Sequence, residues 1–127
     1  MVGYLIDNNV ISNYFSGVFS EKAMRFLSDV IDKTPNLSVI TKIEAISWQS
    51  TDIAKENIVR MFVDISNVIA LSDLIVDECI AIRRNCRMKT PDAIIAATSI
   101  INGFTLLTSD SDFNRISNLR TLNPFDL

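Results

Sequence analysis

The sequence predicts an α/β domain in which a parallel sheet of four to five strands lies between two layers of helices. Short apolar runs alternate along the chain with longer stretches in which apolar residues recur every three or four positions. Strands that are separated by helices favour a parallel sheet with helices on both faces. The length of 127 residues suits one domain. We therefore expect residues 1–127 to form a single three-layer α/β/α domain.

The first half of the chain is predicted to contain two strands and two well-marked helices. Residues 3–6 form the first apolar run, and residues 37–40, preceded by Pro35-Asn36, form the second. Helical spacing of apolar residues follows each run, which indicates helices with one buried stripe. The stripe residues are Ala23, Phe26, Leu27, Val30 and Ile31 in the first helix and Ala54, Ile58, Met61, Phe62 and Ile65 in the second.

A third strand is predicted at residues 68–71, where the chain reads Val-Ile-Ala-Leu. The helix after it is marked by apolar residues at helical spacing. These residues are Ile75, Cys79, Ile82 and Cys86.

The segment Thr90-Pro91-Asp92 predicts another helix start. Thr90 is expected to cap the helix, Pro91 to occupy its first turn, and Asp92 to complement the helix dipole. Residues 93–101 are apolar nearly all round, so this helix should be buried in the middle of the domain. Asn102-Gly103 ends it, and strands are then expected at residues 104–107 and, more briefly, at 119–122.

Composition excludes several classes of activity. The chain has no histidine, which removes Ser-His-Asp and Cys-His catalysis and zinc hydrolysis based on histidine ligands. Its two cysteines have no second pair to complete a zinc site, so we expect them to be reduced in a cytoplasmic protein.

No stretch approaches the roughly 18 apolar residues of a membrane span, and residues 1–7 do not resemble a signal peptide. The net charge of -3 argues only weakly against nucleic-acid binding, because bound cations reverse the local sign.

Four carboxylates stand where chain segments are predicted to leave the core. Asp7 and Asp110 follow the first and fourth strands, Glu44 follows the second strand, and Asp92 opens the apolar helix. Ligands of parallel sheets bind beyond the carboxyl ends of the strands, so we expect the four acids to converge at that edge. Like charges repel one another, and a divalent cation is the natural group to relieve the repulsion.

Each acid also has a structural explanation, because carboxylates favour helix starts. In that interpretation Asp7 caps the helix after it, Asp92 complements a helix dipole, and Asp110 caps a short helix. Thr41-Lys42-Ile43-Glu44 fits a capping box, which would account for Glu44. The functional interpretation therefore depends on all four acids lying at one edge of the sheet.

Several segments of the chain resemble the successive motifs of PIN-domain ribonucleases. Within that family they are most similar to the VapC-type toxins of prokaryotic toxin–antitoxin pairs, and the resemblance covers nearly the whole chain. Its most specific parts are the block from Pro91 to Ala97 and the stretch from Thr108 to Phe113. The matching segments are Asp7-Asn8-Asn9-Val10-Ile11, Glu44, residues 89–98 (Lys-Thr-Pro-Asp-Ala-Ile-Ile-Ala-Ala-Thr) and residues 106–113 (Leu-Leu-Thr-Ser-Asp-Ser-Asp-Phe).

The resemblance implies a parallel five-stranded sheet flanked by helices, and it implies where the catalytic acids lie. They correspond to Asp7, Glu44, Asp92 and Asp110. Asp112 would be a fifth acid near the metals. The family usually has Thr or Ser directly after the first acid, whereas this chain has Asn8, which changes how the site is supported. Asn8, Asn9 and Thr108 are the polar residues expected to support the ligands.

Oxygen ligands without histidine or thiolate suit Mg²⁺ or Mn²⁺, with one or two ions in the site. Two such ions about 3.5–4 Å apart can activate water and stabilise the leaving oxygen in phosphodiester hydrolysis. We expect Asp7 and Asp92 to bind the first ion, Glu44 and Asp110 to extend the site, and Asp112 to orient water. By resemblance the substrate is RNA, cut to leave a 5′-phosphate and a 3′-hydroxyl.

Other residues are candidates for contacts with RNA or protein. Arg83, Arg84, Arg87 and Lys89 form a basic run that can contact phosphates, although a solvated helix face explains most of them. Four aromatic residues outside the core pattern suit either stacking on RNA bases or a protein interface. They are Tyr14, Phe15, Phe19 and Trp48. Resemblance to VapC-type toxins implies a homodimer and a separate small antitoxin that covers the metal site.

Two other functions are compatible with parts of the sequence. A receiver-like or phosphatase-like domain also has aspartates after its first strand, but it needs a lysine after a later strand and none follows Leu107. The chain has only three glycines and no Gly-rich phosphate loop. The second alternative is a PIN-like module that only binds protein or RNA; the four acids argue against it and Asn8 favours it.

Overall fold

The computed structural model describes residues 3–127, in which five short parallel strands form one sheet in the order β3-β2-β1-β4-β5. The strands are β1 (Tyr4–Ile6), β2 (Asn36–Ser38), β3 (Asn67–Ile69), β4 (Thr105–Leu107) and β5 (Thr121–Leu122). Residues 1 and 2 lie outside the described residues. They belong to the segment 1–7, which is predicted not to be a signal peptide. The predicted parallel sheet is confirmed, whereas the division into a single domain stays a prediction.

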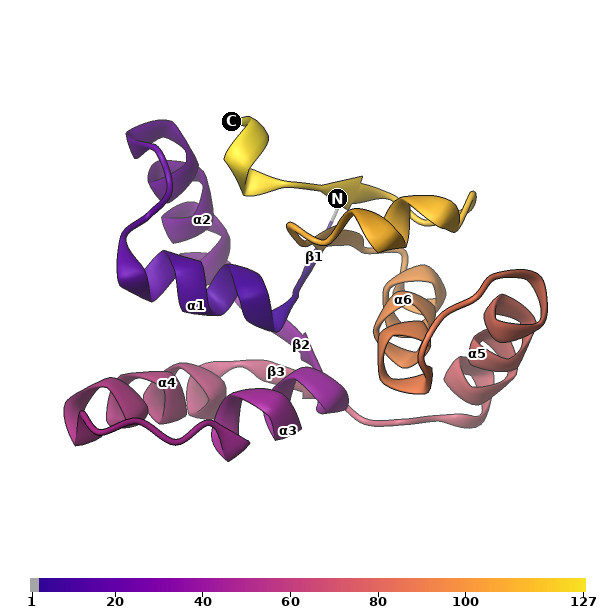
Figure 1. The fold of residues 1–127 in the computed structure, drawn as a ribbon, viewed down its shortest axis with the longest axis horizontal. Coiled ribbons are helices and arrows are strands. Elements are labelled where there is room, and N and C mark those ends of the chain that lie inside the picture. The colour runs from indigo at the N-terminus through magenta and orange to yellow at the C-terminus, as the bar shows by residue number, and fades with distance from the viewer. Residues whose placement is uncertain (1–2) are drawn as a thin grey trace.

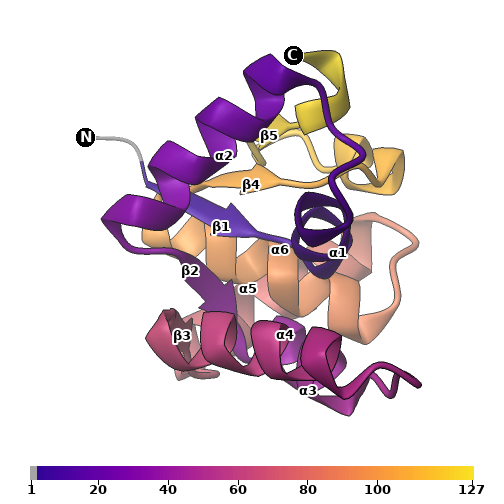
Figure 2. The same cartoon turned by 90° about the vertical axis from the view of Figure 1, so that its left-hand side faces the viewer.

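Within residues 3–127, six α-helices and two 3₁₀ helices connect and cover the strands (Figure 1). The α-helices are α1 (Asn8–Ser16), α2 (Glu21–Lys33), α3 (Val39–Ser47), α4 (Ile53–Ile65), α5 (Asp73–Asn85) and α6 (Thr90–Asn102), and the 3₁₀ helices are η1 (Ser111–Arg115) and η2 (Pro124–Asp126). Figure 2 shows the strands fanned from β3 to β5, with α1 and α2 on the near side and α6 and α5 behind. This is a three-layer α/β/α arrangement, as the sequence predicts.

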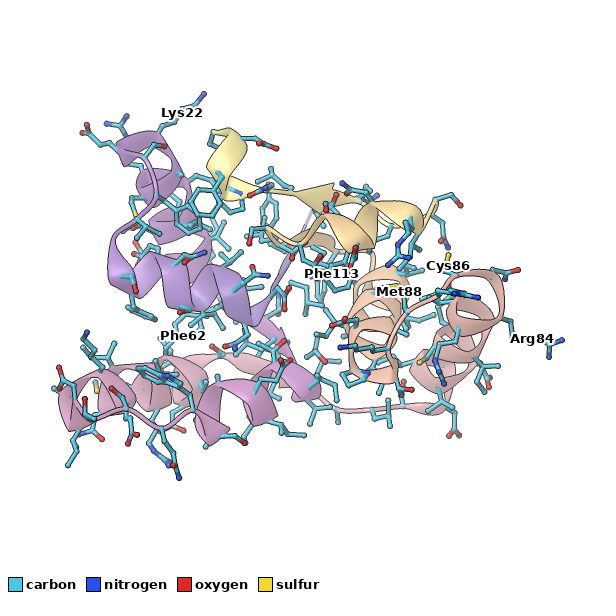
Figure 3. All side chains as sticks on the ribbon, viewed as in Figure 1. Lys22, Phe62, Arg84, Cys86, Met88 and Phe113 are labelled. Atoms are coloured by element: carbon cyan, nitrogen blue, oxygen red, sulfur yellow. The ribbon has the colours of Figure 1, made fainter. Side chains whose placement is uncertain are left out.

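The two faces of the sheet are buried by different helices because neighbouring residues of a strand point in opposite directions. Leu5 pairs with Leu106, and both face a cluster formed mainly by α5, α6 and η1. Ile6 pairs with Leu107, and both face the cluster formed by α1, α2 and α4. Phe113 of η1 closes the α6 side and is labelled there in Figure 3. The two central strands β1 and β4 thus each supply a buried side chain to both layers, although each is only three residues long.

The second strand is shorter than predicted, because the chain turns into α3 at Val39 rather than after Ile40. The Ser38 hydroxyl accepts a hydrogen bond from the Ile40 N–H at 3.1 Å and so caps the helix. This cap makes the capping box predicted at Thr41 wrong, since Thr41 lies inside α3. Its hydroxyl oxygen is buried and has no hydrogen-bond partner among residues 3–127.

The start of α6 also differs by one residue from the prediction. Lys89, not Thr90, is the N-cap residue, and no side chain caps this helix. The Lys89 carbonyl already accepts a hydrogen bond from the Ala93 N–H at 3.0 Å, so the first turn closes before Thr90 can act as a cap. Asp92 lies in that first turn, as predicted, and Gly103 ends the helix in the left-handed conformation at φ 68°.

Two predictions about burial are wrong. Of the stripe predicted for α4, only Phe62 is buried: Met61 and Ile65 are 67% and 66% exposed, and Ala54 and Ile58 are exposed as well. The reason is that only the Phe62 and Val63 face of this helix packs on the rest of the protein. Phe19, expected outside the core, is 6% exposed and packs on Phe125, with ring centroids 4.5 Å apart. No helix within residues 3–127 has the length and apolar character needed to cross a membrane.

The order of the strands has a direct consequence for ligand binding. Strand β1 lies at the centre, the chain continues to β2 and β3 on one side, and it later places β4 and β5 on the other. Ligands bind where a parallel sheet changes direction in this way, in the crevice beyond the carboxyl ends of the strands. In this chain that point lies between β1 and β4, just before Asp7 and Asp110.

Candidate carboxylate site at the edge of the sheet

The four candidate acids are positioned by four different elements at one edge of the sheet. Asp7 follows β1 and is the N-cap of α1, and Asp110 follows β4 and is the N-cap of η1. Asp92 lies in the first turn of α6, and Glu44 lies within α3 beyond β2. The capping roles anticipated for Asp7 and Asp110 are therefore real. These roles do not prevent the acids from forming a shared site, because a carboxylate that caps a helix still has lone pairs left for another ligand.

Asp7 has the most hydrogen bonds of the four acids, since its carboxylate accepts three. Asn8 donates its backbone N–H to one oxygen at 2.8 Å, and the Thr108 hydroxyl donates to the other at 2.8 Å. The side-chain amide of Asn9 also donates to this second oxygen, at 3.1 Å. A carboxylate offers about four lone pairs, so Asp7 keeps acceptor capacity for a further ligand while its orientation is fixed.

The same hydrogen bonds join the first and fourth strand ends. Thr108 accepts from the Asp110 N–H at 3.1 Å and from the Asn9 amide at 3.3 Å. The carbonyl oxygen of the Asn9 side chain accepts from the Ser109 N–H at 3.2 Å. These contacts hold the loop that carries Asp110 against the loop that carries Asp7, which is the supporting role expected of Asn9 and Thr108.

Electrostatic interactions show that the four acids lie close together. Burial raises the pKa of Asp7 above its ordinary value of 3.8, against the hydrogen bonds from Thr108 and Asn8, and the charges of Asp92 and Asp110 raise this pKa further. The pKa of Asp92 is raised mainly by desolvation and further by the charge of Asp110. The positive charge of Lys89 lowers this pKa in part.

Glu44 is the most exposed of the four acids, yet it belongs to the same electrostatic group. Partial desolvation raises the pKa of its carboxyl group, and the charges of Asp7 and Asp92 raise that pKa further. Neither Asp7 nor Glu44, Asp92 or Asp110 forms an ion pair with any residue of 3–127. The site therefore carries negative charge that the described part of the protein leaves unneutralised.

The donor set fits Mg²⁺ or Mn²⁺, which prefer carboxylate oxygen to nitrogen or sulfur. As the side chains lie, no three Asp, Glu or Cys residues of the described chain are grouped tightly enough to hold an ion among them. Mg²⁺ is usually bound by only one or two carboxylates together with waters. Asp7, with its free acceptor capacity, and Asp92, whose charge raises the pKa of Asp7, are the residues that would hold such an ion.

The remaining predicted site residues are placed less centrally. The Asn8 backbone N–H binds Asp7, but the Asn8 side chain lines a groove beside the site. Asp112 is exposed and pairs with Arg115 at 3.5 Å, although its charge still raises the pKa of Asp92. Of the basic run, Lys89 acts on Asp92, whereas Arg84 points outward from the end of α5 (Figure 3).

Sequence inspection missed the groove itself. It is lined by residues of α1, α3 and α4, among them Ser12, Lys55 and Ile58. Ser12 lies four residues after Asn8, so both fall on one face of α1, and that spacing was the available signal.

Comparisons with known proteins agree with this architecture. One chain of a structure described as a toxin–antitoxin complex from Klebsiella pneumoniae is 26% identical, with a TM-score of 0.76 over 96% of this chain and 98% of that one. FitAcB from Neisseria gonorrhoeae gives 21% identity and a TM-score of 0.79 over 98% and 99% of the two chains. DNA-bound VapBC from Salmonella typhimurium gives 19% identity and the same TM-score over the same shares. No curated protein matches the chain by sequence.

The fold and the site together define a parallel α/β domain with a cluster of carboxylates beyond the central strands. Residues 4–119 match the PIN domain model, and the chain belongs to the PIN domain family, whose members related to VapC are nucleases. The fold expected from the motifs is thereby confirmed.

Divalent metal should stabilise this protein, because ions that bind only the folded state raise its free energy of unfolding. Mn²⁺ at about a hundred times its Kd should add about 2.7 kcal/mol. Thermal melting in EDTA and then in Mn²⁺ measures the effect. Asp92→Asn should lose most of the Mn²⁺ effect, whereas Asp64→Asn, an exposed acid near the end of α4, should keep it. Equal Mn²⁺ effects in all three proteins would contradict a metal site at the cluster.

The pH dependence of the metal-free protein should reflect the raised pKa of Asp92. A carboxyl group whose pKa is higher in the folded than in the unfolded state destabilises the fold as pH rises through the interval between the two values. The free energy of unfolding of Asp92→Asn should therefore exceed that of the wild type by an amount that grows as pH rises above about 4 and levels off once Asp92 is ionised in the folded state. Urea unfolding in EDTA measures it, and a difference independent of pH would count against the repulsion described here.

Proposed function

We propose that this protein is a metal-dependent endoribonuclease of the kind found as the toxin of toxin–antitoxin pairs. The observation that carries the proposal is the gathering of four acids, without ion pairs in residues 3–127, at the point where the sheet changes direction. Membership of the PIN domain family supports nuclease activity, and the oxygen-only donor set supports Mg²⁺ or Mn²⁺. RNA is the proposed substrate.

A divalent cation, when bound, supplies activation of water and neutralisation of charge on the scissile phosphate. The protein's own residues hold the geometry for that chemistry. Asp7 is fixed by Thr108 and Asn9, and Asp110 is tied to it through the same threonine. Asp92 and Glu44 complete the acidic wall from α6 and α3. Asp112 is assigned a role in orienting water at the outer edge.

Contacts with the RNA backbone are assigned first to Lys89. Its positive charge lowers the pKa of Asp92, and no other residue of the basic run has such an effect on Asp92. Arg83 donates a hydrogen bond to the Met88 carbonyl at 3.3 Å, and Arg83 and Arg84 lie in the last turn of α5, where they complement the helix dipole. We therefore give Arg83, Arg84 and Arg87 a smaller share of RNA binding.

A binding module without catalysis is the second candidate. It is favoured by Asn8, whose side chain lines the groove and forms no hydrogen bond with the carboxylates. A Thr or Ser at that position would offer a hydroxyl directly after the first acid. A module of this kind should neither be stabilised by Mn²⁺ nor cleave RNA.

A separate antitoxin is the proposed protein partner. The similar chains come from structures described as toxin–antitoxin complexes or as VapBC and FitAB pairs, some of them bound to DNA. An antitoxin that covers the carboxylates would restrain the activity. We also keep the cytoplasm as the proposed location, since both cysteines are free.

A homodimer is proposed to form through the outer face of α5. Leu74 is 65% exposed and Ile80 is 53% exposed, and exposed apolar groups of this size indicate an interface. Light scattering should give twice the 14.2 kDa of one chain. Leu74→Lys with Ile80→Lys should halve the measured mass. Met61→Lys with Ile65→Lys tests the rival surface on α4, whose side chains are at least as exposed, and should leave the mass unchanged; the reverse result would place the interface on α4. A monomeric wild type at all concentrations would end this part of the proposal.

RNA cleavage is the decisive test of the activity. The purified chain with total RNA and Mg²⁺ should produce cuts carrying 5′-phosphates, and sequencing of the new 5′ ends should reveal the target. Asp7→Asn should reduce the rate by at least about a hundredfold, because it removes the charge that would bind the ion and mismatches the amide of Asn9. Asp64→Asn should cleave like the wild type.

Two outcomes would contradict the proposal. Cleavage that persists unchanged in EDTA would exclude the metal-dependent reaction. Cleavage that Asp7→Asn retains in full, while its melting temperature falls, would show Asp7 to be a structural cap of α1 and nothing more.

A further inference from the structure

A groove of about 730 Å³ adjoins the carboxylates, between α1 on one side and α3 and α4 on the other. Asn8 and Glu44 belong both to the acidic site and to the wall of this groove. An RNA strand whose phosphate lies at the acids therefore has the groove within reach of its neighbouring nucleotide. Figure 1 shows α1 running above α3 and α4 in this region.

Two aromatic side chains from different helices line the groove and remain accessible. Phe15 of α1 is 42% exposed and Trp48 at the end of α3 is 45% exposed. Phe15 is held in place by edge contacts with Tyr14 and Phe62, whose ring centroids lie 5.2 Å and 5.6 Å from its own. Phe62 rises from α4 toward α1 in Figure 3. Phe15 is thus a rigid, half-exposed ring rather than a mobile surface residue.

The polar groups of the groove complement the aromatic ones. Lys55 of α4 is the cation among the lining residues and Glu44 is the anion. Three serines, Ser12, Ser16 and Ser47, add hydroxyl groups that can donate and accept hydrogen bonds. Aromatic faces, one cation and small polar groups next to a nuclease site match the chemistry of a nucleotide. The groove also has four aliphatic lining residues, which are Ile11, Ala45, Ile58 and Val59. A purely aliphatic partner would contact these but would leave Lys55 and the three hydroxyls without a role.

We propose that this groove binds one unpaired base of the RNA strand next to the cleaved phosphate. Phe15 and Trp48 stack on the base, and Lys55 contacts the phosphate beyond it. The proposal rests on the ribonuclease function given above and deepens it, because a base can enter only when it is splayed out of a helix. The enzyme would then act on single-stranded segments and read the base beside the cut.

Fluorescence provides the direct test, since Trp48 is the only tryptophan of the chain. Asp7→Asn, which should leave RNA intact, is titrated with single-stranded RNA and with the same sequence as a duplex. Single-stranded RNA should quench the Trp48 emission with saturation, and the duplex should not. No quenching by any single strand that the wild type cleaves would overturn the proposal and leave the groove to a protein partner.

Variants of Trp48 and the substrate together locate the base. Trp48→Ala should raise KM for single-stranded RNA by roughly 5- to 150-fold with little change in kcat, and Trp48→Phe should restore most of it. Oligonucleotides carrying one abasic site at successive positions around the cut should contain one position that raises KM equally. At that position the two changes should not add, because they remove the same contact.

The failures of the two proposals can be told apart. If the wild type cleaves RNA but Trp48→Ala has an unchanged KM and melts like the wild type, the groove proposal is wrong and the ribonuclease remains. If single-stranded RNA quenches Trp48 and no protein cleaves, the catalytic proposal is wrong and the groove binds bases. If Trp48→Ala melts far below the wild type, Trp48→Phe and the abasic series decide, because neither removes the ring from its packing.

Discussion

Repulsion among carboxylates gathered beyond β1 and β4 is the constraint on which the rest of this structure depends. Three of the acids have a raised pKa because the fold buries them and places them near one another. A set of hydrogen-bond donors offsets the repulsion in part, with Thr108 and Asn9 both turned toward Asp7. The repulsion that remains favours the binding of a cation. The same charges therefore lower the stability of the metal-free fold and raise its affinity for metal.

Helix α1 connects the carboxylate site with the groove proposed to bind a base. Its first residues orient Asp7 through a backbone N–H and the amide of Asn9. Further along the same helix, Phe15 lines the groove. Because α1 is one rigid element, the distance between acid and base-binding surface is fixed by its length. Asn8 belongs to both surfaces, which gives a physical meaning to its departure from the usual Thr or Ser.

Much of the fold and most of the acid positions followed from the sequence, because alternating apolar runs and helical stripes are local patterns. The strand order did not follow, since the pairing of β1 with β4 joins residues about a hundred positions apart and no local signal records it. Apolar character also failed to predict burial in α4, where Met61 and Ile65 face outward. The groove was missed because its lining comes from three helices, each contributing few residues with no pattern of their own.

The pairing of the first strand with the fourth also sets the point in translation at which the carboxylate cluster can first assemble. The hydroxyl of Thr108 reaches Asp7 across 101 positions of the chain. Ribosomes build from the amino end, and a nascent chain that stops before residue 105 contains neither β4 nor Asp110. Translation products that end before residue 105 therefore lack the assembled cluster, and any activity of this site requires a chain made at least through Asp110.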